Sequence, residues 1–466
     1  MQVVIPQDQS AAALLGRLKV RKSEKYRRTK LMISVACEGG KLYLNTLTGE
    51  LLFRGPHEGV DRNELIEKWF MVPRSFDETG HADELRRIAR MLVRSDGKTH
   101  FTILTTTDCN AHCAYCYEAG ARRISMTPET AADVGTYIAR EARGQTVHLS
   151  WFGGEPLLNG EAIDVICRVL RESGVEFRSK LTTNGYFLNG QTAGKAVREW
   201  GLREVQITLD GTERVYNSVK NYVPEGDEST GFLGTESDVP EGSGSPYLRV
   251  MENVGAALRA GLTVLLRLNL SRDNAEDLPA LADELAARFP DRTHLNTQVV
   301  LVAPLAGHIH EFASEKEAYL QRKKLEEKLM RLGLRRTGVL ARGVRVNQCI
   351  ADNDACEVIL PDGRIQRCEH FDESEVAGSI YSPERDREII AKWKETVRFE
   401  NCAECPLYPR CVSLKWCGWL RDGCSDERKK YLIEKTRDRM IATYKKAREE
   451  RIAAAPVLKE EYHHVF

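Results

Sequence analysis

Short apolar stretches alternate with amphipathic ones through the middle of the chain. Six stretches rich in β-branched and aromatic residues predict strands between residues 99 and about 304: FTILTTT, VHLSWFGG, FRSKLTTNG, EVQITLDG, TVLLRLNL and QVVLVAP. Five stretches with apolar residues at helical spacing separate them: PETAADVGTYIAREA, AIDVICRVLRES, TAGKAVREWG, NVGAALRAG and LPALADELAARF. Parallel strands need a long connection, usually a helix, so this alternation predicts an α/β fold with a parallel sheet or barrel.

The pattern changes on both sides of this core. Before it, short strands precede two helical runs, DRNELIEKWF and HADELRRIARMLVR, which predict a small α+β domain. After it come a charged helix, EKEAYLQRKKLEEKLMRLG, a cysteine-rich region and a charged helical tail. The predicted segments are an α+β domain at 1–98, the core at 99–310, a bridging helical segment at 311–345, a cysteine-rich domain at 346–430 and a tail at 431–466. Residues 223–247, rich in Gly, Ser, Pro and acidic residues, are predicted to form a surface insertion.

Charge and hydropathy exclude several classes of protein. Lys and Arg together number 68, as do Asp and Glu, so no net positive field favours nucleic acid. No run of 18 apolar residues predicts a membrane helix, and the first residues lack the pattern of a signal peptide. We therefore expect a cytoplasmic protein without a membrane or nucleic-acid partner.

The thirteen cysteines are distributed unevenly. Cys109, Cys113 and Cys116 lie in TTTDCNAHCAYCYEAG, directly after the first predicted core strand, and eight more lie near the C-terminus. In a reducing compartment, clustered cysteines usually ligate metal or take part in catalysis. Closed metal sites use four ligands, so three thiolates predict a partner elsewhere or an open coordination position. The two remaining cysteines have structural interpretations: Cys167 as a buried thiol in a helix, and Cys37 in or beside a strand.

Cys-x3-Cys-x2-Cys after the first strand of a β/α alternation, with Tyr115 before the last cysteine, resembles the cluster loop of radical S-adenosylmethionine (SAM) enzymes. The resemblance implies a partial (β/α)6 TIM-type barrel. It also implies a [4Fe-4S] cluster held by these three thiolates, with S-adenosylmethionine on the fourth iron. The open position would then be catalytic: the reduced cluster would cleave the cofactor to a 5'-deoxyadenosyl radical, which abstracts hydrogen from a substrate carbon.

Polar motifs follow the later strands in the same order as in that family. Gly153, Gly154 and Glu155 in WFGGEPLL resemble its GGE motif. The other strand-end candidates are Thr183, Asn184, Thr208, Asp210, Arg267 and Asn269. The resemblance implies that these groups bind the ammonium, carboxylate and ribose of the cofactor, with Arg267 on the carboxylate and Tyr115 on adenine. Taken singly, each has an ordinary interpretation, since a strand-end Asn-Gly is usually a turn and Arg267 could be a surface charge.

The C-terminal cysteines resemble the SPASM domain of the same superfamily, which holds auxiliary [4Fe-4S] clusters. The resemblance assigns Cys349, Cys356, Cys368 and Cys417 to a first cluster. It assigns Cys402, Cys405, Cys411 and Cys424 to a second. The protein would then carry three [4Fe-4S] clusters. A gap of five residues before Cys417, where the family commonly has three, leaves the assignment of Cys417 and Cys424 open. A pair of zinc sites is the alternative for this region.

SPASM relatives mostly act on peptides, and the N-terminal segment YLNTLTGELL resembles the leader-recognition elements of peptide maturases, which bind by strand addition. The predicted function is a maturase that installs a thioether or carbon-carbon cross-link in a ribosomally made precursor peptide. Its partners would be the leader-bearing precursor and an electron donor such as flavodoxin or ferredoxin. The alternatives are a sulfatase-maturating enzyme, with Glu369 beside Cys368 as catalytic residue, a peptide epimerase, and a zinc-stabilised interaction protein. A purely scaffolding N-terminal region is also compatible with the sequence.

Overall fold

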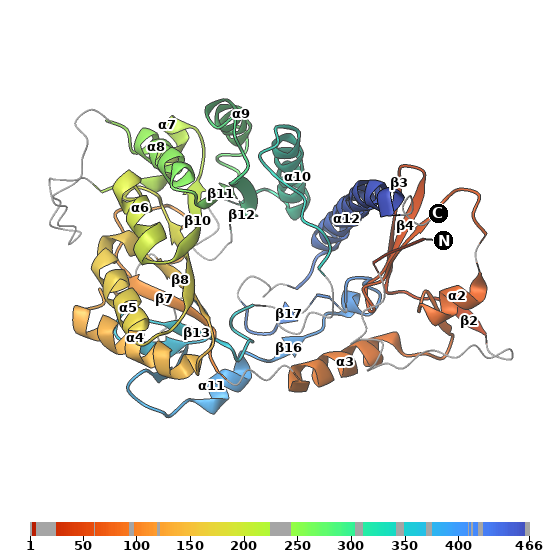
Figure 1. Ribbon diagram of the computed structural model, residues 1–466, viewed down its shortest axis with the longest axis horizontal. Coiled ribbons are helices and arrows are strands. Elements are labelled where there is room, and N and C mark those ends of the chain that lie inside the picture. Colours follow the sequence, from red (N-terminus) through yellow and green to blue (C-terminus); the bar gives the residue numbers. More distant parts are fainter. Residues whose placement is uncertain are drawn as a thin grey trace. The chain divides into compact units, whose positions relative to one another are not determined.

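The computed structural model divides the chain into two compact units (Figure 1). The larger contains Ser95–Arg336 and Cys349–Glu395; the smaller contains Met1–Arg94, Thr337–Gln348 and Thr396–Phe466. The structure describes residues 2–5, 25–59, 61–92, 97–118, 122–223, 244–302, 311–341, 349–369, 375–408, 410–411, 413–417 and 423–461. The cysteine-rich segment 346–430 is divided between the two units. The boundaries of the five segments expected from the sequence remain a prediction.

Six parallel strands form the sheet of the larger unit, each paired with the next in chain order. They are β7 (His100–Thr106), β8 (Val147–Gly153), β9 (Phe177–Thr183), β10 (Leu202–Leu209), β11 (Thr263–Leu270) and β12 (Leu295–Leu301). The connecting helices are α4 (Pro128–Ala142), α5 (Gly160–Glu172), α6 (Gly190–Glu199), α7 (Glu213–Lys220), α8 (Pro246–Arg259) and α9 (Leu278–Arg288), with a short η1 (Pro156–Asn159) before α5. The predicted partial (β/α)6 barrel is confirmed. Most of the predicted insertion at 223–247 lies outside the described residues.

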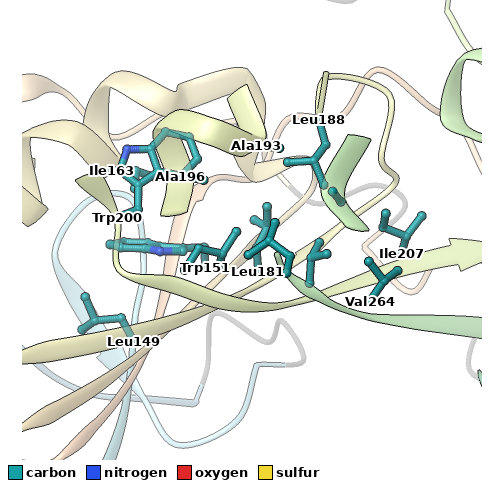
Figure 2. Close-up of a cluster of buried hydrophobic side chains, with 14 of the residues drawn as sticks. Leu149, Trp151, Ile163, Leu181, Leu188, Ala193, Ala196, Trp200, Ile207 and Val264 are labelled. Carbon is teal, nitrogen blue, oxygen red and sulfur yellow. The ribbon is translucent and has the colours of Figure 1, made fainter. Parts of the chain in front are cut away.

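Alternation along the strands gives the sheet one apolar and one polar face. Leu149, Trp151, Leu181, Ile207 and Val264 point toward the helices, where they pack in the main hydrophobic core (Figure 2). Their helix-side partners in this view are Ile163, Leu188, Ala193, Ala196 and Trp200. The intervening positions carry polar side chains, including Ser150, Lys180, Gln206, Thr208 and Arg267. Because charged groups are seldom packed in an apolar core, this inner face is the one suited to a polar ligand.

A β-hairpin from the cysteine-rich segment extends the barrel sheet beyond β7. β13 (Cys356–Ile359) pairs in parallel with β7, and β14 (Arg364–Gln366) and β15 (Val376–Ser379) follow in antiparallel order. Glu357 on β13 is buried and accepts a hydrogen bond of 2.5 Å from the Tyr137 hydroxyl on α4. Lys98 lies 3.5 Å from the same carboxylate. The hairpin is therefore anchored to the barrel by backbone pairing and by a buried charged group. α10 (Glu315–Arg331) packs on β12, and α11 (Arg387–Lys392) on β15.

The smaller unit is built on an antiparallel sheet with the strand order β1 (Gln2–Ile5), β5 (Leu51–Arg54), β4 (Gly40–Asn45) and β3 (Met32–Cys37). A second pair joins β2 (Tyr26–Arg28) to β6 (Met71–Pro73), and a third joins β16 (Thr396–Val397) to β17 (Ser413–Leu414). The helices are α2 (Arg62–Glu67), α3 (Glu78–Leu92) and the long α12 (Asp426–Glu461), with a short η6 at Glu400–Cys402. The predicted α+β region and helical tail are thus present.

The two cysteines expected to be structural lie as predicted. Cys37 is the last residue of β3, and Cys167 is completely buried in α5. Within the part of the chain that the structure describes, no helix has the length and apolar character needed to cross a bilayer.

Candidate functional site

The loop that follows β7 carries Cys109, Cys113 and Cys116. The Cys116 amide donates to the Cys113 carbonyl at 3.0 Å, which closes a tight turn between the last two cysteines. On its other side the loop is fixed to the end of α7, because the His112 amide donates to the carbonyls of Lys220 at 3.0 Å and Asn221 at 3.1 Å. The loop therefore depends on contacts with the end of α7 as well as on β7.

Burial raises the pKa of all three thiols, and that of Cys116 reaches about 11. At Cys109 the Glu155 carboxylate and then the other two thiols add to this rise. Among the described residues, no three Cys, His, Asp or Glu side chains surround a single metal-ion position. The three thiols lie close enough together that the charge of one raises the pKa of another. Three thiols in one loop fit a cluster with an open coordination position, because a bound metal centre supplies the positive charge that makes them thiolates.

Gly153 and Gly154 support this loop at the end of β8. A Cβ atom on Gly153 would lie 2.1 Å from the Thr106 carbonyl oxygen, and one on Gly154 would lie 2.1 Å from the Asp108 carbonyl oxygen. Gly153 also has a φ of 126°, which side-chain-bearing residues rarely adopt. The Gly154 amide donates to the Thr106 carbonyl at 3.1 Å. The two glycines are thus required for close contact between β8 and the cysteine loop.

The Glu155 side chain connects β8 to β9. It is completely buried, and its two oxygens accept from the Thr183 hydroxyl at 2.8 and 2.9 Å. The backbone amides of Asn184 and Leu157 donate to it at 2.8 and 3.0 Å. Burial raises the pKa of Glu155 to about 7, although these hydrogen bonds oppose the rise. The carboxylate is therefore part of the framework of the site.

Asn184 lies beside the cysteine loop. Its side-chain nitrogen donates to the Asn110 side-chain oxygen at 2.7 Å and lies 4.0 Å from the Cys109 sulfur. Further along the sheet, Thr208 and Arg267 are direct cross-strand neighbours, and Arg267 Nε donates to Asn269 Oδ1 at 2.9 Å. The strand-end residues predicted from the sequence therefore form one group by the cysteine loop and another on β10 and β11.

Tyr115 is held by a buried ion pair that the sequence did not reveal. Its hydroxyl donates to the Asp210 carboxylate at 2.8 and 2.9 Å. Lys220 Nζ lies 3.1 Å from Asp210 Oδ2 and 3.2 Å from the Tyr115 hydroxyl. The side chains of Lys220 and Asp210 are only 4% and 0% exposed. Lys220 ends a short polar helix, a position that usually points to solvent, so no sequence signal marked it.

Glu369 lies within electrostatic range of the inner face of the sheet. Burial raises its pKa, and the charges of Lys180 and Arg267 oppose this rise. Glu118, which follows the cysteine loop, also has a pKa raised to about 7, first by burial and then by Glu369. Oxygen Oε1 of Glu118 is buried without a hydrogen-bond partner. Two carboxyl groups and two cations therefore lie near the predicted reaction site. Glu118 is a further candidate site residue that the sequence did not single out.

The comparisons with known proteins agree with this arrangement. Residues 103–285, which span most of β7 through most of α9, match the model of the Radical SAM superfamily. This segment is therefore similar to radical SAM enzymes. A curated relative, Fe-coproporphyrin III synthase from Methanosarcina barkeri (strain Fusaro / DSM 804), is 28% identical over 182 residues, which are 39% of each chain. The chain thus spans about two fifths of the length of this relative.

Two solved structures share the fold of this chain. Native anSMEcpe with bound AdoMet and Cp18Cys peptide has a TM-score of 0.55 at 15% identity, covering 76% of this chain and 99% of that chain. Streptococcus suis SuiB bound to precursor peptide SuiA has a TM-score of 0.50 at 11% identity, covering 83% of this chain and 94% of the other. At these identities the likeness establishes the fold, including regions on both sides of the radical SAM domain.

Three cysteines of the predicted first auxiliary site lie beside that domain. Arg367 is buried, and its guanidinium donates to the carbonyls of Ala351, Asn353 and Cys356 at 2.8 to 3.1 Å. It thereby shapes the segment between Cys349 and Cys356, and Cys368 is the next residue in the chain. Burial raises the pKa of Cys356 to about 11, and Cys349 contributes to the rise. The predicted fourth ligand, Cys417, belongs to the smaller unit, so this set of four stays a prediction.

The predicted second auxiliary set lies entirely in the smaller unit. Its members are Cys402, Cys405, Cys411 and Cys424. Burial is the main cause of the raised pKa of Cys405, Cys411 and Cys424, and at each of them other thiols of the set add to it. The Cys405 amide donates to the Cys402 carbonyl at 3.1 Å. Four thiols in electrostatic contact suit a fully ligated iron-sulfur cluster.

Proposed function

We propose that this chain is a radical SAM maturase that forms a thioether or carbon-carbon cross-link in a ribosomally made precursor peptide. The observation that carries the proposal is the position of the cysteine loop. It sits at the carboxyl ends of the strands, next to a polar inner face with the carboxyl groups of Glu118 and Glu369 and the cations of Lys180 and Arg267 nearby. Active sites of β/α barrels gather at this end.

The protein's own residues position the reactants. Cys109, Cys113 and Cys116 would hold the catalytic cluster, and Gly153 and Gly154 would keep their loop in place. The Tyr115 ring, oriented through Asp210, would pack on adenine. Thr208, Arg267 and Asn269 would contact the ribose and carboxylate of S-adenosylmethionine. When bound, S-adenosylmethionine and the iron-sulfur clusters supply a 5'-deoxyadenosyl radical and accept the electron released on oxidation.

Glu369 is proposed as the base of the reaction. Forming a cross-link removes two hydrogens from the peptide. One would be taken as a hydrogen atom by the radical chemistry that the bound cofactor supplies, and the other would leave as a proton to Glu369. A partly buried carboxyl group with a raised pKa is suited to accept that proton. The electron would come from, and return to, a small redox protein such as flavodoxin or ferredoxin.

Two features support a peptide as the substrate. The fold is shared with anSMEcpe and SuiB, whose structures were solved with bound peptides. In the smaller unit, β3 is an edge strand of the antiparallel sheet, the kind of site to which a leader segment can add as a further strand.

The test is anaerobic incubation of the reconstituted protein with S-adenosylmethionine, a reductant and the small peptide encoded beside its gene. High-resolution mass spectrometry should show a peptide lighter by two hydrogens, and fragmentation should locate the new bond. Release of 5'-deoxyadenosine without a mass change would overturn cross-linking. In that case, deuterium uptake from heavy water would identify an epimerase, and oxidation of a sulfatase-derived peptide would identify a formylglycine-generating enzyme.

The role of Glu369 has a matched control in the same unit. Glu369→Gln should still release 5'-deoxyadenosine but form cross-linked peptide about 100-fold more slowly, because general bases contribute roughly 10²–10⁴-fold. Glu384→Gln alters an exposed carboxylate and should leave both rates unchanged. Equal cross-linking rates in the two variants would exclude Glu369 as the base.

A further inference from the structure

The N-terminal strands and the second auxiliary cysteine set share their hydrophobic cores. One cluster packs Leu31, Leu47 and Trp69 with Tyr408 and against Cys402 and Cys405. Another packs the strand residues Ile33, Leu42, Leu44 and Leu51 with Leu407 and against Cys405 and Cys411. Residues far apart in the sequence thus surround the same cysteine segment, and residues of the N-terminal region belong to both clusters.

Arg86 on α3 reaches the cysteine segment directly. Its side chain is 9% exposed, and Nη2 donates to the Tyr408 carbonyl at 2.9 Å and to the Cys411 carbonyl at 3.4 Å. The guanidinium also lies 5.2 Å from the centre of the Tyr408 ring. Asp83, one turn earlier on the helix, accepts a hydrogen bond from the Tyr408 hydroxyl. A buried positive charge is therefore bonded to the backbone of a predicted cluster ligand.

The turn between β4 and β5 holds the same segment from another direction. The Thr46 hydroxyl donates to the Pro406 carbonyl, and Arg410 Nε donates to the Thr46 carbonyl at 3.1 Å. A Cβ atom on Gly49 would lie 2.6 Å from Arg410 Nη2, and the φ of Gly49 is 79°. Pro406 and Arg410 are therefore bonded to this turn, and Tyr408 and Cys411 are bonded to α3.

We propose that the N-terminal α+β region forms the protein environment of the second auxiliary cluster. Within it, Arg86 positions the segment that carries Cys405 and Cys411 and raises the reduction potential of the cluster. The proposal rests on the proposed function in one respect, namely that Cys402, Cys405, Cys411 and Cys424 hold a [4Fe-4S] cluster. Reduction adds negative charge to the cluster, and a fixed guanidinium bonded to a ligand's carbonyl favours the reduced form.

The test isolates this cluster in the full-length chain. Substituting Cys109, Cys113, Cys116, Cys356 and Cys368 by Ala leaves only the second predicted ligand set complete. Arg86→Gln, Arg86→Lys and Arg87→Gln are then compared in this background by iron content, electron paramagnetic resonance of the reduced cluster and potentiometric titration. Arg87 is the matched control because it is the neighbouring arginine, is 61% exposed and pairs with Glu84 on the surface.

Arg86→Gln should lower the reduction potential of the cluster and change its resonance signal. Arg86→Lys should stay closer to the parent, because it keeps the positive charge. Arg87→Gln should match the parent in both measurements. A potential and signal in Arg86→Gln equal to those of Arg87→Gln would overturn the proposal. If Arg86→Gln loses its iron, recovery of the cluster in Arg86→Lys supports the role of the charge, and loss in both variants excludes it. A parent background without iron would instead refute the assignment of the cluster itself.

Discussion

Lys220 and Asp210 form an ion pair that is almost completely removed from solvent, and it fixes the hydroxyl of Tyr115 beside the cysteine loop. Burial disfavours the charged form of Lys220, but Asp210 and then Cys113 raise the pKa of this amine to well above its ordinary value. Lys220 therefore keeps its charge across the working pH range. Breaking a buried pair by removing one member leaves an uncompensated charge, which is costlier than never having had the pair.

Lys220→Met should lower the free energy of unfolding by about 3 kcal/mol and the rate of 5'-deoxyadenosine release by at least about tenfold, because Asp210 is left unpaired and Tyr115 loses its orientation. Denaturant unfolding and chromatographic assay of 5'-deoxyadenosine measure the two effects. Lys195→Met is the control: this lysine pairs with Asp164 at the surface, where such pairs contribute about 0–1 kcal/mol. Indistinguishable behaviour of the two variants would contradict the role assigned to Lys220.

Glu50 gives the smaller unit a predictable response to pH. Its side chain is buried, its Oε2 has no hydrogen-bond partner, and burial raises its pKa from 4.5 to about 7 even though Lys68 opposes the rise and Glu64 adds to it. Below about pH 4.5 the group is protonated whether the chain is folded or not. Between about pH 4.5 and 7 only the unfolded chain loses the proton, so stability falls as the pH rises.

Glu50→Gln should remove this dependence and stabilise the protein at about pH 8 by an amount on the order of 3 kcal/mol, which is the pKa difference expressed as free energy. Urea unfolding at about pH 5 and pH 8 measures it. Glu67→Gln changes an exposed carboxylate of α2 and should retain the parent's pH dependence. A Glu50→Gln variant that is still less stable at the higher pH by the same amount would show that another group is responsible.

At the level of elements, the cysteine loop and the end of β8 form one structure. The loop's carbonyls lie directly against Gly153 and Gly154, so its shape is set by a neighbouring strand as much as by its own sequence. The two glycines of the GGE motif therefore allow close packing against the loop, and its Glu155 accepts a hydrogen bond from Thr183 on β9.

Gly154→Ala should reduce the iron bound by the Cys109 loop and abolish 5'-deoxyadenosine release, because the new methyl group would displace the Asp108 carbonyl. Iron analysis and the release assay report this in a background lacking the auxiliary cysteines. Gly190→Ala is the control, since a Cβ atom at this first residue of α6 meets no other atom within 4 Å. Full iron content in Gly154→Ala would contradict the close packing described here.

The sequence predicted those elements whose local pattern is strong. The barrel strands have clear apolar faces, and α4 and α5 carry apolar residues at every turn, so periodicity alone identified them. It did not predict α7, which has eight residues and whose buried side chains are only Tyr216 and Lys220. It also gave no sign that β13 extends the barrel sheet, because pairing between Cys356 and His100 joins distant parts of the chain.

The sequence predicted those parts of the candidate site that the spacing of residues along the chain can identify. Cys109, Cys113 and Cys116 and the strand-end residues were predicted because their order along the chain resembles that of the radical SAM motifs. The contributions of Lys220, Glu118 and Arg367 depend on burial and on partners far away in sequence, and neither can be inferred from residue type.

At the scale of the whole molecule, cysteine chemistry is divided between two compact units. One holds the loop with Cys109, Cys113 and Cys116 and the segment from Cys349 to Cys368, and the other holds Cys402 through Cys424. The number of iron centres therefore tests the predicted cluster ligands of both units in one measurement.

Anaerobically reconstituted protein should bind about twelve irons per chain, as expected for three four-iron clusters. Joint replacement of Cys402 and Cys405 by Ala should remove about four of them and leave the signal of the SAM-binding cluster intact. Replacement of Cys37 and Cys167, which belong to no predicted set, should remove none. Zinc in place of iron in the purified protein would exclude the radical mechanism altogether.

The shared core of the N-terminal strands and the Cys402–Cys424 segment affects how this protein can be dissected and recombined. A truncation at residue 94 would remove the N-terminal apolar residues that share a core with Leu407 and Tyr408. Loss of peptide modification by such a truncated enzyme would thus be uninformative about leader recognition. Chimaeras that exchange the N-terminal region between maturases would need to exchange the segment from Thr396 to α12 with it, and the two segments are expected to have been inherited together.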